Sequence, residues 1–361
     1  MPESLYIHIP FCNSICTYCD FAKVYYDLFS RKRYLSVLIE EIKSLSIEDR
    51  SLKTIYIGGG TPSSLDDEEL KMLLSYLHER FDNVEEFSFE CNPESLTREK
   101  MSILKKYGVN RISLGVQTTS KRGLKILGRK HKVKDVKRCL KDLKEVGFDN
   151  INLDFIFGYR NENYLNLLND IHFAINAEVS HLSFYSLIIE DNTILKINNE
   201  KYLSDERLSK MYSLINRKLK KASFNHYEIS NYAKKGKESK HNLKYWKDET
   251  YYAVGVSSSC YVADYREKNT SSITSYLNGV ITKEIDKLTS EDKKEEFIML
   301  SFRLKEGVDL KRYSELFSTS FLEEKKKAIE KNREFLNISF NNISIKEEYM
   351  FISDSIVSDF F

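Results

Sequence analysis

Three cysteines, Cys12, Cys16 and Cys19, lie close together near the start of the chain, directly behind a strand-like run at Leu5–Ile9. Thiolates at this spacing can hold a soft metal, and zinc and iron–sulfur clusters are the usual occupants of such loops. A four-iron cluster held by only three cysteines leaves one iron without a protein ligand. That open iron would favour catalysis or cofactor binding over plain electron transfer.

Two other uses of these cysteines have to be weighed. A disulfide framework fits poorly, because six cysteines in 361 residues, with no signal-like apolar segment and no stretch able to span a bilayer, predict a cytosolic and reduced protein. A structural zinc site would need a fourth ligand, from His8 or from one of the remote cysteines, Cys91, Cys139 and Cys260. Structural zinc usually uses paired C-x2-C motifs. Zinc therefore stays open, and an iron–sulfur cluster is favoured.

The elements that must position this loop are predicted by alternation of strands and helices. Six strand-like runs occur, at Leu5–Ile9, Thr54–Gly58, Phe87–Cys91, Arg111–Val116, Ile151–Phe157 and Leu182–Leu187. Most are separated by stretches of helical period, which predicts an α/β fold with a parallel sheet, open or curled into a barrel. Thr97 and either Ser64 or Asp66 can begin helices, and Gly147 can end one.

Residues of period two give each run an apolar face and a polar face. The polar face carries Glu90, Asp154 and, at a strand end, Gln117. Branched aliphatic side chains normally fill a small barrel, so inward carboxylates and amides would be costly unless a ligand or water satisfied them. A glycine-rich turn, Gly58–Pro62, also follows the second run, and beside the cysteines it indicates close approach of the backbone to a ligand. The sequence predicts a ligand-filled barrel with its site at the carboxyl ends of the strands.

The joint order of several motifs resembles the radical S-adenosylmethionine (SAM) proteins, and within them the HemW branch of the coproporphyrinogen oxidase group. The motifs are Tyr6–Cys12, Cys19–Phe21, Ile57–Ser63, Gly108–Gln117, Leu127–Arg129, Asn150–Asp154, Tyr227–Ala233 and His241–Trp246. The resemblance implies a partial (β/α)6 radical SAM barrel. We expect this core at 1–200, an aromatic-rich extension at 201–288, and a smaller winged-helix-like α+β region at 289–361.

The resemblance also implies cofactors. It places a [4Fe-4S] cluster on Cys12, Cys16 and Cys19, with the open iron bound by the amino and carboxylate groups of SAM. Contacts with SAM and the cluster are assigned to Tyr6, Gly59, Gly60, Thr61, Glu90, Gln117, Arg129 and Asp154. Arg129 is assigned by the resemblance alone, since alternation and position do not single it out.

Three features favour the HemW branch over the coproporphyrinogen dehydrogenases of the group. Only five residues precede Tyr6, where the dehydrogenases carry an extension, and Phe21 stands where they have a further cysteine. The HemW branch also has a His-Asn-x-x-Tyr-Trp segment associated with haem binding, which begins here at His241. A neutral imidazole is a common axial ligand of haem iron, but a histidine among aromatic residues is more often part of a core. Both interpretations of His241 stay open.

The resemblance therefore implies a haem chaperone that binds haem and transfers it to acceptor haemoproteins, related to coproporphyrinogen dehydrogenase but lacking that activity. The alternative is an anaerobic coproporphyrinogen III decarboxylase of porphyrin biosynthesis. The chain departs from the family pattern at Gly158–Asn161, at Glu190–Ile194 and at Ser257–Cys260, which puts haem or substrate handling in doubt. We expect a cytoplasmic protein that meets membranes only through a partner.

Charge gives little support for a nucleic-acid partner, because 56 basic residues face 54 acidic ones. One exception is Lys121–Arg138, with nine Lys and Arg and a single acidic residue. A solvated helix face and a patch for phosphates both fit this segment, and action on RNA is the weakest of the three functions considered. In the second half we expect helices at 204–222, 291–304 and 310–317. We also expect a surface connection at Arg266–Ser272 and a strand pair around Ile343–Ile352.

Overall fold

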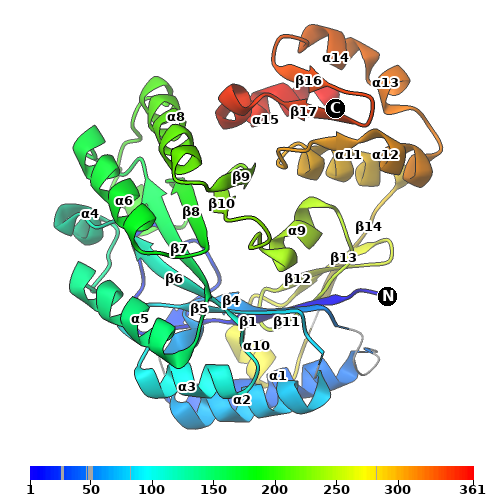
Figure 1. Cartoon of the computed structure of the whole chain (residues 1–361). Coiled ribbons are helices and arrows are strands. Elements are labelled where there is room, and N and C mark those ends of the chain that lie inside the picture. Colours follow the sequence, from blue (N-terminus) through cyan, green and yellow to red (C-terminus); the bar gives the residue numbers. More distant parts are fainter. Residues whose placement is uncertain (26–27, 46, 48–51, 82, 282) are drawn as a thin grey trace.

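The computed structural model describes residues 1–25, 28–45, 47, 52–81, 83–281 and 283–361. Its centre is a nine-stranded sheet in the order β11-β1-β4-β5-β6-β7-β8-β10-β9 (Figure 1). The middle of this sheet is parallel and consists of β1 (Ser4–Ile9), β4 (Thr54–Gly59), β5 (Glu86–Cys91), β6 (Arg111–Gln117), β7 (Asn150–Phe157) and β8 (His181–Ser186). All six predicted strands are confirmed, each within one residue at either end.

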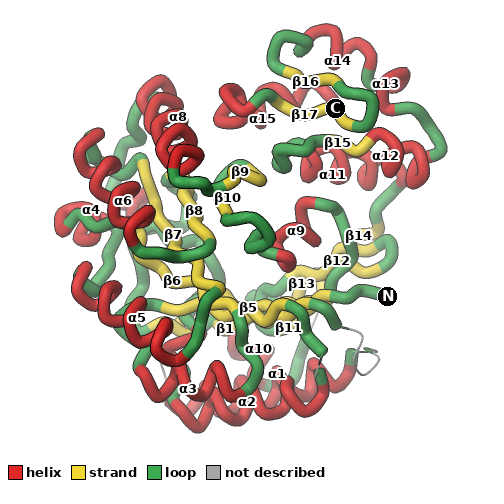
Figure 2. Tube along the Cα trace, viewed as in Figure 1, coloured by secondary structure: helices red, strands yellow, loops and turns green. Residues whose placement is uncertain are grey.

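Helices cover the apolar face of this sheet (Figure 2). They are α1 (Leu28–Ser44), α2 (Asp67–Arg80), α3 (Arg98–Lys106), α4 (Lys121–Ile126), α5 (Val133–Val146) and α6 (Tyr164–Asn176). Their ends follow the expected chemistry: Asp66 begins α2 with a capping box, Thr97 accepts a hydrogen bond from the Lys100 amide, and Gly147 ends α5 in the left-handed region at φ 95°. The α/β fold with a central parallel sheet is confirmed.

The two edges of the sheet come from later in the chain. β11 (Tyr252–Val254) pairs in parallel with β1, and β10 (Asn231–Ala233) pairs antiparallel with β8 and with β9 (Asn225–Glu228). These strands follow α8 (Asp205–Lys221), a helix that the pattern at 204–222 predicts. The edge strands β11 and β9 do not pair with each other in the described part of the chain, so within these residues the sheet does not close into a full barrel.

A second, antiparallel sheet contains β12 (Ser259–Val262), β13 (Tyr265–Asn269) and β14 (Lys283–Lys287), with α10 (Ile273–Leu277) between the last two. The expected surface connection at Arg266–Ser272 is wrong for Arg266–Asn269, which belong to the central strand β13, and right only for 270–272, which join β13 to α10. Its polar side chains have partners: the Arg266 guanidinium lies 4.0 Å from the Tyr261 ring centroid and donates to Glu296. A polar run can therefore form a strand when its half-buried charge, here Arg266, is paired in the folded chain.

The C-terminal module begins with α11 (Ser290–Ser301), the helix expected at 291–304, and Thr289 caps it. It contains α12 (Leu310–Phe317) and a small sheet of β15 (Val308–Asp309), β17 (Asn342–Ile345) and β16 (Leu336–Ile338). The expected strand pair around Ile343–Ile352 is wrong in its second half, because Glu347–Ile352 is a 3-10 helix. The partner of β17 is β16, which a tight turn at 339–341 joins to it. No helix among the described residues is long and apolar enough to span a membrane.

Candidate cofactor pocket

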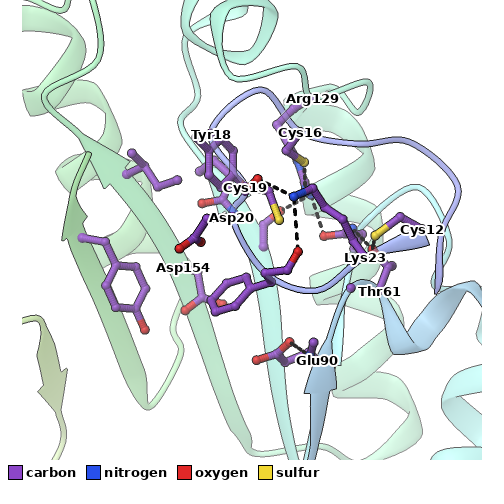
Figure 3. Close-up of a pocket in the computed structure, with 18 of the residues that line it drawn as sticks. Cys12, Cys16, Tyr18, Cys19, Asp20, Lys23, Thr61, Glu90, Arg129 and Asp154 are labelled. Carbon is purple, nitrogen blue, oxygen red and sulfur yellow. Dashed lines mark hydrogen bonds between the residues drawn. The ribbon is translucent and has the colours of Figure 1, made fainter. Parts of the chain in front are cut away.

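A cavity of about 450 Å³ opens where β4, β5, β6, β7 and β8 end. Its lining includes all three cysteines and most of the predicted contacts, namely Gly59, Gly60, Thr61, Glu90, Gln117, Arg129 and Asp154 (Figure 3). Tyr6 is the exception. Its ring stacks on that of Tyr56 at 6.1 Å, and its hydroxyl lies 3.0 Å from His8 Nδ1, so it supports the wall from behind.

The cysteine loop is anchored at both ends. β2 (Phe11–Cys12) pairs in parallel with β3 (Val24–Tyr25), and the Thr17 amide donates to the Leu127 carbonyl at the end of α4. Cys12 is buried, whereas Cys16 and Cys19 are half-buried, and burial raises the pKa of Cys12 to about 11. A bound cation would reverse this, since thiols lose their protons on metal coordination.

The donor set of the loop suits a soft metal. The Arg129 guanidinium donates to Cys16 Sγ at 3.5 Å, and its buried Nε has no hydrogen-bond partner within the described residues. The three thiols face one cavity but do not yet form a closed ligand group in the described parts of the chain. Of the alternative zinc ligands, His8 Nε2 lies 2.9 Å from the Ala22 carbonyl oxygen and is engaged there. Cys91 also lines the cavity, on the wall formed by the end of β5. The three thiols of the cysteine loop open onto the same cavity, and this arrangement fits a three-thiol site with an open face.

The glycine-rich turn packs against the cysteine loop. The Gly60 amide donates to the Ile9 carbonyl at 2.8 Å and the Thr61 amide to the Phe11 carbonyl at 2.9 Å. A Cβ atom at Gly60 would lie 2.7 Å from the Pro10 carbonyl carbon and 3.0 Å from Cys12 Sγ. Glycine is therefore required here by the close approach of two loops, whatever ligand the cavity holds.

Two carboxylates form the polar wall. Glu90 accepts hydrogen bonds from the Tyr56 hydroxyl at 2.7 Å and the Gly59 amide at 3.1 Å. Asp154 accepts hydrogen bonds from the Ser113 hydroxyl at 2.7 Å and from the side-chain amide of Asn152 at 2.8 Å. Burial, with a smaller contribution from Asp154, raises the pKa of Glu90 to about 7, and burial also raises the pKa of Asp154. Such groups can accept further hydrogen bonds from the hydroxyls of a polar ligand.

The far side of the cavity depends on a bend at the end of β6. The register of β6 with β7 shifts between Gly115 and Gln117, and Gln117 has φ 64°, in the left-handed region. Asp170 of α6, almost fully buried, accepts from the Thr118 hydroxyl and the Thr119 amide, each at 2.6 Å. Burial raises the pKa of Asp170 to about 6. This carboxylate fixes the segment just beyond Gln117.

Sequence reasoning missed Tyr56 and Asp170. Tyr56 alternates with Thr54 and Gly58 on the polar face of its strand, so the same period-two pattern could have identified it. Asp170 gives no such signal, because it lies on a helix and meets its partners only in the folded chain.

His241 lies away from the cavity, on α9 (Lys240–Trp246), and its side chain is fully buried. Its Nδ1 is 2.8 Å from the Thr54 hydroxyl and its Nε2 is 2.7 Å from the Tyr245 hydroxyl. Burial lowers its pKa to about 3, so the ring stays neutral. Both ring nitrogens are therefore occupied in this conformation, and haem ligation by His241 stays a prediction.

A parallel sheet with a three-cysteine loop and a glycine-rich turn at its carboxyl edge defines a class of protein. The radical SAM superfamily profile matches residues 6–174, and the profile of the HemN C-terminal domain matches residues 288–348. The structure is similar to that of the radical SAM enzyme coproporphyrinogen III oxidase (HemN) from Escherichia coli, with a TM-score of 0.86. That similarity covers 99% of this chain and 90% of the other at 19% identity, and it shows the fold.

Comparison with curated relatives identifies the family within the radical SAM superfamily. The chain is 40% identical to the heme chaperone HemW of Lactococcus lactis, over 89% of this chain and 86% of the relative. It is 38% identical to that of Bacillus subtilis, over 88% of both chains, and 33% identical to that of Escherichia coli, over 85% and 84%. The chain belongs to the HemW family of radical SAM proteins. Membership in the superfamily implies a [4Fe-4S] cluster and SAM as cofactors.

Proposed function

We propose that this protein is a haem chaperone, which binds haem and passes it to an acceptor haemoprotein. The observation that carries the proposal is the identity of 33–40% with proteins named heme chaperone HemW, over more than four fifths of each chain. The fold similarity to coproporphyrinogen III oxidase does not favour decarboxylation, because fold does not fix function.

In this proposal Cys12, Cys16 and Cys19 hold the cluster. Such a cluster would leave one iron open to SAM and would supply one-electron redox chemistry there. The residues of the chain have separate tasks: Arg129 donates toward the Cys16 sulfur, and Glu90 and Asp154, which line the same cavity, would accept hydrogen bonds from the hydroxyl groups of SAM. Gly59, Gly60 and Thr61 provide a backbone edge that a bulky side chain would block, and Gln117 closes the opposite side.

Haem is the cargo and His241 its proposed iron ligand. A neutral imidazole suits this role, and Tyr245 and Trp246 of the same helix can cover an apolar macrocycle. Because both nitrogens of His241 are hydrogen-bonded, iron must displace the Tyr245 hydroxyl or the Thr54 hydroxyl.

The test is a hemin titration of anaerobically reconstituted protein, followed in the Soret region, with His241→Ala in parallel. We expect saturation near one haem per chain and at least tenfold weaker binding by the variant. His78→Ala and His172→Ala are matched controls, because these histidines are exposed and would report only adventitious ligation. Transfer is measured by adding apomyoglobin to the loaded protein and following the holo-myoglobin spectrum.

Two results would refute the proposal. One is the lack of saturable haem binding by the wild-type protein. The other is anaerobic conversion of coproporphyrinogen III by the reconstituted protein with SAM and a reductant, which would establish the decarboxylase alternative.

A further inference from the structure

Glu86, the first residue of β5, makes an unusual set of contacts. Its carboxylate accepts hydrogen bonds from the Lys240 amide at 2.9 Å, the His241 amide at 3.0 Å and the Ser239 hydroxyl at 3.3 Å. These three donors form the start of α9. Glu86 is only 3% exposed. A buried carboxylate at the amino end of β5 therefore holds α9, the helix that carries His241.

The chemistry of this contact indicates more than packing. Burying a carboxylate is costly, and well-packed apolar residues are usually as stabilising at such a position. Apart from the Ser88 hydroxyl at 3.3 Å, the hydrogen bonds that Glu86 accepts within the described residues all come from positions 239–241. Hydrogen bonds to a charged acceptor are strong. Because the three bonds from positions 239–241 all end on the Glu86 carboxylate, they break together when α9 moves away from it.

The rest of α9 is held by equally separable contacts. His241 bonds the Thr54 hydroxyl, its ring lies 5.3 Å from that of Tyr56, and the Lys240 ammonium pairs with Glu85 at the surface. Apart from His241, the side chains of this seven-residue helix are half-buried or exposed. The apolar contacts that oppose its departure are few, chiefly the Tyr245 ring against the Tyr251 ring at 4.5 Å and the Arg303 guanidinium over the Trp246 ring at 4.4 Å. The helix lies between the sheet and the C-terminal module (Figure 1).

We propose that Glu86 is a positioning residue that keeps α9 docked and His241 closed, and that α9 must undock before His241 can bind haem iron. This inference rests on the proposed haem chaperone function and adds a regulated step to it. When the binding-competent state is a minor one, the apparent dissociation constant is the intrinsic constant divided by the fraction of that state. Weakening the clamp therefore tightens haem binding.

The first measurement needs no haem. Backbone amide hydrogen exchange is followed at residues 242–246 in the wild type, in Glu86→Gln and in Glu85→Gln. We expect α9 to exchange by local opening, about tenfold faster in Glu86→Gln, because its amide group would face the backbone donors. Glu85→Gln is the matched control, since within the described residues its carboxylate bonds only the exposed Lys240 ammonium, and such a surface pair contributes little to holding α9. Exchange of α9 only through global unfolding in all three proteins would refute the inference and leave the chaperone proposal intact.

The second measurement is hemin affinity. We expect binding about tenfold tighter in Glu86→Gln, unchanged in Glu85→Gln, and abolished when His241→Ala is added to Glu86→Gln. Tyr245→Phe serves if Glu86→Gln does not fold, because it removes only the hydroxyl that holds Nε2 and is also expected to tighten binding. Equal or weaker binding by both variants, beside normal wild-type binding, would overturn the inference. If α9 opens locally but no variant binds haem saturably, the proposed function fails instead.

Discussion

Two opposing effects act on the pKa of the Glu90 carboxylate in the ligand-free protein. Its neighbours donate hydrogen bonds that favour the charged form, yet burial outweighs them and raises its pKa to about 7. Near neutral pH the residue therefore stands close to its midpoint in the ligand-free protein. A ligand hydroxyl that donates to it would favour the ionised form and order the wall.

The titration of Glu90 has a predicted effect on stability. Its pKa of about 7 in the folded protein exceeds the ordinary value of 4.5, so its stabilising contribution is complete below pH 4.5 and is lost as the pH rises through 7. From pH 5 to pH 8, Glu90→Gln should gain about 2 kcal/mol relative to wild type in the free energy of unfolding. Chemical denaturation of the metal-free protein measures it. A difference between the two proteins that does not change with pH would contradict the prediction.

A second residue-scale prediction concerns Gly60. The Cβ of Gly60→Ala would meet the Pro10 carbonyl and the Cys12 sulfur, so either the turn or the cysteine loop must shift. We expect a loss of about 1–3 kcal/mol in stability and a large fall in iron and sulfide per chain after reconstitution. Gly236→Ala is the control for backbone strain without a clash, because its φ is +78° and nothing lies within 4 Å of its added Cβ, so it should lose stability but keep a normal iron content. Normal iron content in Gly60→Ala would show that the two loops do not constrain each other.

At the scale of elements, prediction succeeded where the signal was local. Each of the six central strands alternates between faces within its own few residues, and Asp66, Thr97 and Gly147 mark helix ends by their own side chains. The same alternation placed Glu90 and Asp154 on the cavity wall. The position of His241 could not be read this way, since its burial depends on Thr54 and Glu86, far away in the sequence.

The two strands that the sequence did not predict have a common physical cause. β11 has three residues and is a strand only because β1 offers a free parallel edge. β13 reads as a polar connection because Arg266 is paired only after α11 folds against it. In each case a tertiary contact outweighed local propensity.

Helix α6 positions the end of β6 through Asp170, and this gives an element-scale prediction. Asp170→Ala leaves the Thr118 hydroxyl and the Thr119 amide without their partner, which should cost about 2–3 kcal/mol. Because Gln117 precedes these residues, SAM affinity measured by equilibrium binding should fall as well. Asp149→Ala, which removes an exposed pair with Lys237, is expected to change stability by less than about 0.5 kcal/mol. Unchanged SAM affinity in Asp170→Ala would limit this carboxylate to a structural role.

At the scale of the whole molecule, the C-terminal module is fastened to the barrel edge by backbone and charge. The Ile229 amide donates to the Arg303 carbonyl, and the Lys305 amide donates to the Tyr227 carbonyl. α9 lies beside this junction, and the Arg303 guanidinium lies 4.4 Å from the Trp246 ring centroid. A change in how the module docks would therefore change the contacts of α9, the helix that carries His241.

Glu347 is the charged part of this attachment. His226, with Nδ1 3.8 Å from the carboxylate, together with Lys305 and Lys220, lowers the pKa of Glu347 to about 2. Its stabilising contribution is present above the ordinary value of 4.5 and is lost as the pH falls through 2.

Glu347→Gln should therefore lose about 1–2 kcal/mol at pH 7, after allowance for the partial exposure of the pair, and clearly less at pH 3. Glu348→Gln, one position along and exposed, is the control and should be neutral at both values. Denaturation curves of the metal-free proteins at the two pH values decide it. Because α9 contacts the same junction, Glu347→Gln should also raise the hydrogen-exchange rate of α9 amides above that in the control. An equal loss of stability at pH 3 and pH 7 would contradict the prediction, because it would mean that packing and not the charge of Glu347 holds the module. In that case the charge of Glu347 would also have no effect on α9.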